Sequence, residues 1–247
     1  MALVLLEDFE KLYTNKWKIP YGRVNGLFPI EPSENLASIV ADLMSDGHLQ
    51  GAPKWRFDYT SNSVEELYRF EKVLFNLFGV KGKIRKCSTN KYGTMNYGVN
   101  NKPLAKILFL CGVPTGAKVD KDYSIPEWII NNPKLFRIFI IRYFSCEGSV
   151  ERTGRIDVQI AKNLTLIPSG INFMNQIRNS LFLYFGIVTN QLYIHPREQV
   201  RKNKISSRMI VLKIGAKDQL LNFYNKVGFE GPKMEKLKQA LELRRML

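Results

Sequence analysis

An internal duplication constrains this chain more than any other feature, because two copies of one segment must fold in the same way. Asp46-Gly47 and Glu147-Gly148 each follow an apolar run and align with one another. Two longer matches come after them in each half: "LFNLFGV" at 74–80 with "LFLYFGI" at 181–187, and "LAKILFLCGV" at 104–113 with "LLNFYNKVGF" at 220–229. Since the matches keep their order, they indicate two divergent copies of one unit.

Each copy shows the same succession of patterns. An apolar helix comes first, as in "ASIVADLMSDGHL" at 37–49, where Gly47 has the character of a helix stop. Polar and apolar residues then alternate in "WRFDYT" at 55–60 and "GRIDVQI" at 154–160, which predicts strands with one buried and one open face. Further strands and a closing helix follow. We therefore expect an α+β fold with antiparallel sheets, helices on one face and a polar, basic face left open.

The repeat also divides the chain. We expect an N-terminal extension at 1–32, a first unit at 33–118, a linker at 119–133 and a second unit with a C-terminal helix at 134–247. The linker region is rich in turn-forming and polar residues. The extension lies outside the repeat and is either an arm along a ligand or a packing extension. Two copies in one chain predict a monomer.

Charge narrows the class of partner. Lys and Arg number 37 against 22 acidic residues, for a net charge of +15 and a pI near 9.7. Such an excess favours a polyanion, most often nucleic acid. Because the charge is spread through strands in both halves, a membrane surface is disfavoured. Three scattered cysteines, no long apolar run and no secretory signal predict an intracellular protein without a zinc site. An archaeal or bacterial cytoplasm is favoured over an organelle.

The two acids are placed unusually. Asp46 and Glu147 each stand at the carboxyl end of a helix, where the helix dipole is already negative. Small residues one turn apart, Ala41 and Ser45, favour close packing of the two helices, which would bring the carboxylates together. Such a cluster requires a counterion, and Mg²⁺ prefers oxygen ligands. One acid of this kind would be an ordinary exposed neighbour of a helix end; the repeated occurrence favours a metal site.

Here the residues resemble a known family. "IVADLMSDG" at 39–47 and "IIRYFSCEG" at 140–148 are similar to the two motifs of single-chain LAGLIDADG homing endonucleases, and the resemblance spans about 33–230. It implies a saddle of two αββαββα units, related by a pseudo-twofold axis, with strands in the major groove of DNA. It further implies site-specific, Mg²⁺-dependent cleavage of both strands across the minor groove, leaving short 3′ overhangs. Two or three divalent ions are expected, with Mn²⁺ as a substitute, and the partner is duplex DNA with a long target site.

The resemblance also assigns residues. Asp46 and Glu147 become the catalytic, metal-binding pair, and the carbonyls of Ser45 and Cys146 become further metal contacts. Side chains on strands near the acids order water and offset developing charge, a role for which Lys213 is the best match and Lys162 the second. In the first copy, the position equivalent to Lys213 falls near Gly98. A contact between Lys213 and the DNA backbone is an equal alternative.

Contacts to DNA are expected from the open strand faces, where Arg and Gln can read bases and Lys can hold phosphates. The residues predicted for this role are Lys54, Arg56, Lys81, Lys83, Arg85, Arg155, Gln159, Gln191, Tyr193, His195, Arg197, Arg201 and Lys204.

One residue departs from the family pattern, and rival functions remain open. Arg142 stands where the family has a small residue, so we expect a clash or a shifted register at the helix seam. The termini lack the His-Asn end of a self-splicing intein, which favours a free-standing, intron-encoded protein. The rivals are an intron RNA-binding maturase of the same fold, a regulator built on an inactive nuclease, and an unrelated basic enzyme. Retention of both acids argues against the first two, and the repeat argues against the third.

Overall fold

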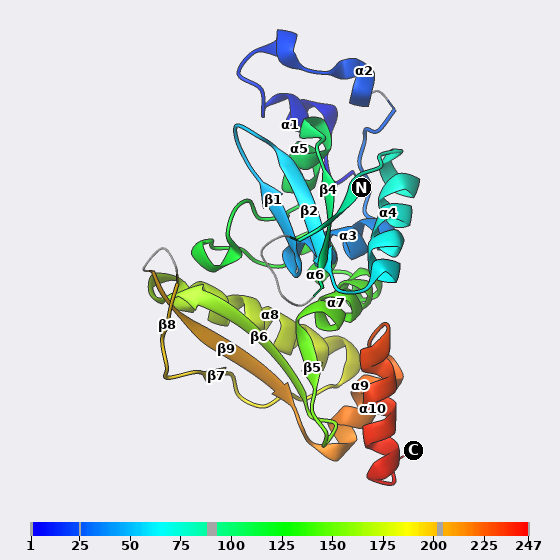
Figure 1. Ribbon diagram of the computed structural model, residues 1–247, viewed down its shortest axis with the longest axis vertical. Coiled ribbons are helices and arrows are strands. Elements are labelled where there is room, and N and C mark those ends of the chain that lie inside the picture. Colours follow the sequence, from blue (N-terminus) through cyan, green and yellow to red (C-terminus); the bar gives the residue numbers. More distant parts are fainter. Residues whose placement is uncertain (1, 25, 88–92, 202–204, 247) are drawn as a thin grey trace. The chain divides into compact units, whose positions relative to one another are not determined.

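The computed structural model describes residues 2–24, 26–87, 93–201 and 205–246. Within these ranges the chain forms two compact units, residues 1–116 and 117–247, and each is described by itself (Figure 1). Residues 119–133, expected as a linker, cluster with the second unit.

The first unit begins with short helices outside the repeat: α1 (Leu6–Glu10), the 3-10 helix η1 (Lys16–Lys18) and α2 (Tyr21–Val24). The repeated segment follows as α3 (Glu34–Met44), β1 (Gly47–Gln50), β2 (Arg56–Ser61), α4 (Val64–Phe78), β3 (Lys83–Lys86), β4 (Met95–Val99) and α5 (Lys102–Leu110). Side chains cap three of these helices. Ser33 accepts a hydrogen bond from the Leu36 N–H, Ser63 from Glu66 and Asn101 from Leu104.

The second unit opens with η2 (Lys118–Asp120) and α6 (Glu127–Ile130). Its repeated segment is α7 (Pro133–Glu147), β5 (Gly148–Val150), β6 (Ile156–Asn163), η3 (Leu164–Leu166), α8 (Ile167–Phe185), β7 (Tyr193–Ile194), β8 (Gln199–Val200), β9 (Ser206–Ile214) and α9 (Lys217–Lys226). A further helix, α10 (Pro232–Leu243), ends the unit.

Strand order shows that the two units share one topology. The first sheet runs β1-β2-β4-β3 and the second β5-β6-β9-β7, with β8 also paired to β9, and all pairs are antiparallel. The register matches as well: Gly47 lies opposite Tyr59, and Gly148 lies opposite Val158. The expected α+β fold of two αββαββα segments with antiparallel sheets is therefore confirmed.

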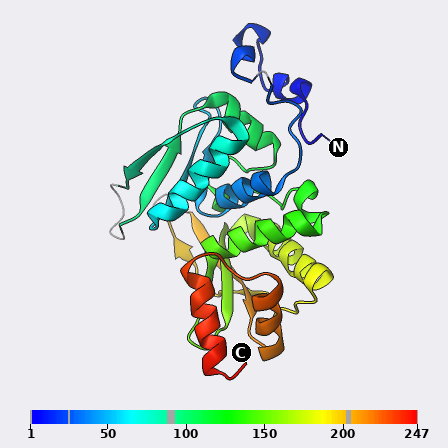
Figure 2. The same cartoon turned by 90° about the vertical axis from the view of Figure 1, so that its right-hand side faces the viewer.

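Helices cover one face of each sheet, and the strand alternation explains how. In the second unit α8 lies behind β6 and β9 (Figure 1), where Ile156, Val158 and Ile160 are buried, while Gln159 on the opposite face is exposed. In the first unit α4 crosses one face of the sheet (Figure 2), and its Phe70 stacks on Tyr59 of β2 at a centroid distance of 4.8 Å. Burying these apolar faces provides the main stabilisation of each unit.

The glycines after the two acids stand at the change from helix to strand, where Gly148 is the C-cap of α7 but Gly47 lies beyond the cap of α3. Helix α3 ends at Met44, and Gly47 already belongs to β1. A side chain at Gly47 would come within 2.6 Å of the Leu43 Cα, and one at Gly148 would meet the Phe144 carbonyl oxygen at 2.5 Å. Both positions therefore need glycine because a strand leaves in close contact with the helix that precedes it.

None of the helices in the described ranges is long and apolar enough to cross a membrane.

Candidate functional site

The two acids occupy equivalent places, each at the junction between the first helix and the first strand of its repeated segment. Asp46 follows the Ser45 cap of α3, and its carboxylate-bearing side chain is exposed. Its backbone carbonyl accepts a hydrogen bond of 3.2 Å from the Thr60 N–H, which fixes this corner to β2. Glu147 is the last residue of α7 and is half-buried. Each acid thus stands on a rigid junction rather than on a loose loop.

The carboxyl end of α7 is held by a cation from α10. The Lys233 Nζ donates to the carbonyl oxygens of Ser145 at 2.6 Å and Cys146 at 2.9 Å. Nearby, the Glu230 N–H donates to the Ser145 Oγ at 2.8 Å. An ammonium at this end offsets the negative helix dipole directly before Glu147. The α9–α10 connection therefore supports the position of this acid.

Sequence reasoning missed Lys233, although the duplication carried a signal for it. "TGAK" at 115–118 and "EGPK" at 230–233 both follow the closing helix of their copy, so a lysine recurs at a similar place after that helix in each copy. The second of these lysines lies at the helix end that carries an acid.

Lys213 lies where the sequence placed it, on β9 next to β6. It is directly opposite Asp157 in the β6–β9 register, is half-buried, and has its Nζ 5.5 Å from the centroid of the Tyr193 ring. In the first sheet Gly98 lies opposite Asp58 at the matching place. The two units therefore differ at this position, with a lysine in the second and no side chain in the first.

Lys162 lies on the core face of β6, in line with Ile156, Val158 and Ile160. It is fully buried, and its Nζ donates to the carbonyl oxygen of Lys118 at 3.0 Å and to that of Lys121. The ammonium also stands 3.8 Å from the centroid of the Tyr123 ring. Burial lowers the pKa of Lys162 to about 8, against opposing contributions from Asp122 and Asp120. Its ammonium thus contacts backbone carbonyls of residues 118–121 rather than the open face.

Tyr123 connects this buried lysine to the acid of α7. Burial raises the pKa of the Tyr123 hydroxyl, and the negative charge of Glu147 raises it further. The Tyr123 ring also packs edge-on against Phe173 of α8 at 5.1 Å between centroids. Tyr123 therefore stays neutral, and its ring packs between Phe173 and the Lys162 ammonium.

Arg142 is accommodated within its own unit. It is almost completely buried on α7 and forms an ion pair with Glu230, in the connection between α9 and α10. The long side chain that the sequence led us to expect as a clash thus has a carboxylate partner.

The donors suit a hard divalent cation. Asp46 and Glu147 offer carboxylate oxygens at negative helix ends, and Mg²⁺ typically takes one or two carboxylates and fills its shell with water and phosphate. The described residues contain no group of three or more His, Cys, Asp or Glu side chains that could enclose a metal. The Cys146 carbonyl oxygen is a poorer metal ligand than expected, because it already accepts a hydrogen bond from the Lys233 ammonium.

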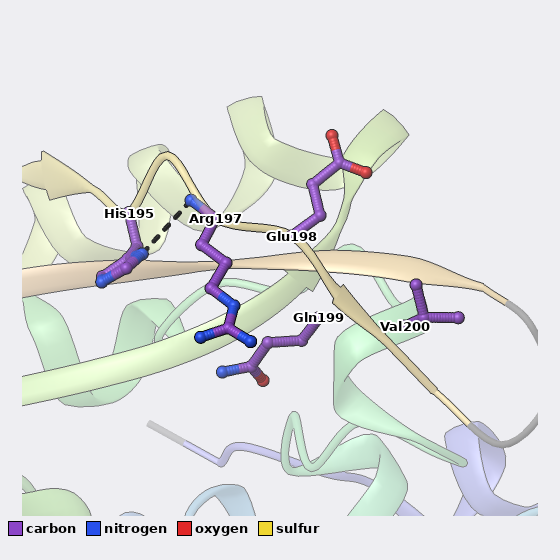
Figure 3. A pocket seen from close by; sticks show the side chains of 5 residues that line it. All are labelled: His195, Arg197, Glu198, Gln199 and Val200. Atoms are coloured by element: carbon purple, nitrogen blue, oxygen red, sulfur yellow. Dashed lines mark hydrogen bonds between the residues drawn. The ribbon is translucent and has the colours of Figure 1, made fainter.

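Every described residue predicted to contact DNA is exposed, and Lys204 lies outside the described residues. Two pockets gather several of them. One, of about 340 Å³, is lined by Pro53, Lys54, Trp55, Arg56, Asn100 and Lys102. The other, of about 580 Å³, is lined by His195, Arg197, Glu198, Gln199 and Val200. In Figure 3 the side chains of Arg197 and Gln199 turn to one side of the strand and Glu198 to the other, where Glu198 binds Arg208 at 2.8 Å.

Two other candidates are already engaged by neighbours. The Arg155 guanidinium donates to both carboxylate oxygens of Asp157 at 2.8 and 3.0 Å, and the Arg56 Nε donates to Gln50 at 2.7 Å. Both side chains are exposed, so these contacts orient them on the surface.

Comparison with solved structures identifies the fold. The chain superposes on a mesophilic variant of the homing endonuclease I-DmoI with a TM-score of 0.52, at 17% identity over 83% of this chain and 97% of that one. It superposes on the homing endonuclease I-WcaI bound to its DNA recognition sequence with a TM-score of 0.52, at 12% identity over 94% and 91%. Full-length WhiA from Thermatoga maritima gives 0.53, at 14% identity over 88% and 64%. The chain therefore has the LAGLIDADG endonuclease fold.

Comparison with curated sequences finds relatives that are named as a ligase and as part of an ATP synthase, not as endonucleases. The chain is 26% identical over 245 residues to the tRNA-splicing ligase RtcB of Methanopyrus kandleri, covering 90% of this chain and 24% of the ligase. It is 32% identical over 131 residues to a component of the A-type ATP synthase of Pyrococcus abyssi, covering 52% of this chain and 12% of that component. The chain thus spans at most about a quarter of the curated relatives it matches. No family model matches it.

Proposed function

We propose that the chain is a site-specific DNA endonuclease of the LAGLIDADG type that cuts both strands of a long target and acts as a monomer. The observation that carries this proposal is the duplicated unit with an acid at the same junction in each copy, Asp46 before β1 and Glu147 before β5. Two strands require two hydrolytic events, so one acid for each copy matches the stoichiometry of a double-strand cut.

In this proposal, the carboxylates of Asp46 and Glu147 are each ligands for a divalent cation, and the Ser45 carbonyl oxygen is a further ligand beside Asp46. When bound, a Mg²⁺ ion there supplies an activated water and stabilises the leaving oxygen of a phosphodiester. The side chain of Lys213 contributes positive charge from β9, and Lys233 contributes positive charge at the end of α7. Such fixed charges favour the extra negative charge of the transition state.

The exposed basic residues hold the DNA. Lys54, Arg56 and Lys102 line one pocket, and Arg197 and Gln199 line another. Arg and Gln can form bidentate contacts with guanine and adenine, whereas Lys contacts phosphates. The net charge of +15 supports strong electrostatic attraction to a duplex.

The sequence relatives support a separable module rather than a ligase. One match covers 90% of the chain and the other 52%, so some residues of this chain are matched by both a tRNA-splicing ligase and part of an ATP synthase. A segment present in two enzymes with different reactions does not account for the reaction of either. A module that occurs in unrelated hosts is the pattern expected of a homing endonuclease.

A plasmid library with randomised inserts tests the proposal directly. The protein is incubated with the library in Mg²⁺, Ca²⁺ or EDTA, and linear products are sequenced. We expect Mg²⁺-dependent linearisation of a small set of related sites and none in EDTA. Binding of library DNA without any cleavage in Mg²⁺ or Mn²⁺ would overturn the proposal.

A further inference from the structure

The N-terminal residues form an arm whose base is firmly attached to the first unit. Val4 and Ile30 form an antiparallel bridge, with the Leu3 N–H donating to the Ile30 carbonyl at 2.7 Å and the Ile30 N–H donating to the Val4 carbonyl at 2.9 Å. Phe9 is fully buried and contacts the rings of Tyr13 and Phe28 at 5.2 and 5.4 Å between centroids. The arm therefore leaves the unit and returns to it at one fixed point.

A buried lysine of α5 fixes the base of the arm further. The Lys106 Nζ donates to the Leu12 carbonyl at 2.7 Å and lies 3.2 Å from the centroid of the Tyr13 ring. Burial lowers the pKa of Lys106. Because Lys106 has only 7% of its surface exposed, these contacts are part of the packed structure. The segment beyond Leu12 is thus held in one place rather than trailing in solvent.

The tip of the arm exposes an indole between cations. Trp17 is 96% exposed and sits in η1 between Lys16 and Lys18, which are exposed as well. Asn15 caps this turn by accepting from the Trp17 N–H at 3.0 Å, while Ile19 and Val24 are buried. The buried residues fix the turn, so the structure holds the Trp17 side chain outward.

The charge of this segment has one sign. Residues 11–30 contain Lys11, Lys16, Lys18 and Arg23 and no acidic residue. Lys11 is paired with Asp8, whereas Lys16, Lys18 and Arg23 are exposed, as are the rings of Trp17 and Tyr21. The Tyr21 hydroxyl donates to Glu10 at 2.7 Å. Aromatic rings interleaved with cations are typical of surfaces that stack bases and hold phosphates. In duplex DNA the base faces are covered by their neighbours, so an indole platform fits an unpaired strand.

We propose that the arm, defined as residues 11–24, binds single-stranded DNA, with Trp17 stacking on an unpaired base and Lys16, Lys18 and Arg23 contacting phosphates. This site is separate from the acids of the proposed endonuclease and does not depend on cleavage.

The test measures binding of a fluorescein-labelled oligo(dT) of about 12 nucleotides to the full chain by anisotropy. Trp17→Ala is expected to weaken binding about 10- to 100-fold, and Trp17→Phe to recover part of the loss because a ring is kept. Lys16→Met with Lys18→Met should lower the slope of log affinity against log salt by about 1.4, from two phosphate contacts. Tyr68→Ala, which removes an exposed ring of α4, serves as the matched control and should have no effect.

Stacking also has a spectroscopic signature. Oligo(dT) should quench the tryptophan fluorescence of the wild type, and Trp17→Phe should remove that quenching while thermal unfolding stays unchanged. Equal affinity of wild type and Trp17→Ala for oligo(dT) would overturn the proposal. Tighter Trp17-dependent binding of a DNA duplex or of oligo(U) than of oligo(dT) would also overturn the proposal. All of these binding measurements are made without divalent metal. Failure of the proposed endonuclease activity would therefore not change the binding result.

Discussion

Asp42 and Arg69 form a buried ion pair between α3 and α4, with 2.5 Å between the Asp42 carboxylate and the Arg69 Nη2. The Asp42 side chain has no exposed surface, and Arg69 also donates to the Ser38 Oγ at 3.2 Å. Asp42 lies on the motif helix that leads to Asp46. Pairing within the unit thus fixes the helix that carries one of the two acids.

Removing one partner of this pair should strongly destabilise the first unit, because the other charge stays buried. We expect Arg69→Met to lower the free energy of unfolding by about 2–4 kcal/mol. Asp42→Leu combined with Arg69→Met should recover most of the loss, since apolar residues of similar size can replace a buried pair. Glu66→Gln, which weakens the outer contact of Glu66 with Arg69 at 3.1 Å, should change the free energy of unfolding by less than about 1 kcal/mol. Urea unfolding measures all three; equal losses in every variant would contradict the account.

Lys233 should matter to cleavage through its position at the end of α7. We expect Lys233→Met to slow cleavage of the target about 100-fold, because it removes a fixed positive charge beside Glu147. DNA affinity should change by less than about threefold, since one contact of this kind contributes little to binding a long site. Lys236→Met, on the exposed side of the same helix, is the control. If Lys233→Arg cleaves faster than Lys233→Met, the positive charge of the side chain is what cleavage requires. A wild-type cleavage rate in Lys233→Met would show that Lys233 has no role in cleavage.

The lysine on β9 has no counterpart in the first sheet, which predicts unequal cutting of the two strands. Lys213→Met should slow one strand about 100-fold more than the other and accumulate nicked plasmid. Strand-specific end labels follow each cut separately. Lys217→Met at the exposed start of α9 should leave both rates unchanged. Equal slowing of both strands by Lys213→Met would indicate a general contact to the DNA backbone instead.

Much of this arrangement could be predicted from the sequence, because duplication and alternation are local patterns. The order of elements and the equivalence of Lys213 with Gly98 followed from matching the copies, and the sheet registers agree. Lys162 stands an even number of residues from Ile156, Val158 and Ile160, so strand alternation already predicted that its side chain lies on the core face.

Contacts between side chains far apart in the sequence could not be predicted. Arg142 pairs with Glu230, and Lys233 binds the end of α7, only because the α9–α10 connection packs beside that helix. No local pattern at Arg142 reveals a carboxylate that lies far along the chain. The role of Gly47 was likewise misread, since only the structure shows how closely β1 leaves α3.

The lowered pKa of Lys162 makes part of the stability depend on pH. Below about pH 8 the lysine is charged in both states, and the folded protein bears the full cost of burying that charge. Between about 8 and the ordinary value of 10.5, the unfolded chain binds a proton that the folded protein lacks, so this group adds stability as pH rises. Lys162→Met removes this dependence.

We therefore expect the stability of Lys162→Met, relative to wild type, to fall by about 1–2 kcal/mol between pH 7 and 9.5. Urea unfolding at both values measures the difference. Lys121→Met, which alters an exposed side chain in the same loop, should show no such trend. A difference that stays constant with pH would show that Lys162 keeps an ordinary pKa in the folded protein.

Substitution of Asp46 and Glu147 tests whether these two acids carry out the proposed phosphodiester hydrolysis. Cleavage of the selected target in Mg²⁺ is compared between wild type, Asp46→Asn and Glu147→Gln, with DNA affinity measured in Ca²⁺ for all three. Each substitution keeps the size of the side chain but removes the charge that holds the cation. Either variant is expected to lose double-strand cleavage by at least about 1000-fold while DNA affinity stays within about threefold of wild type. Cleavage at the wild-type rate in both variants would contradict it.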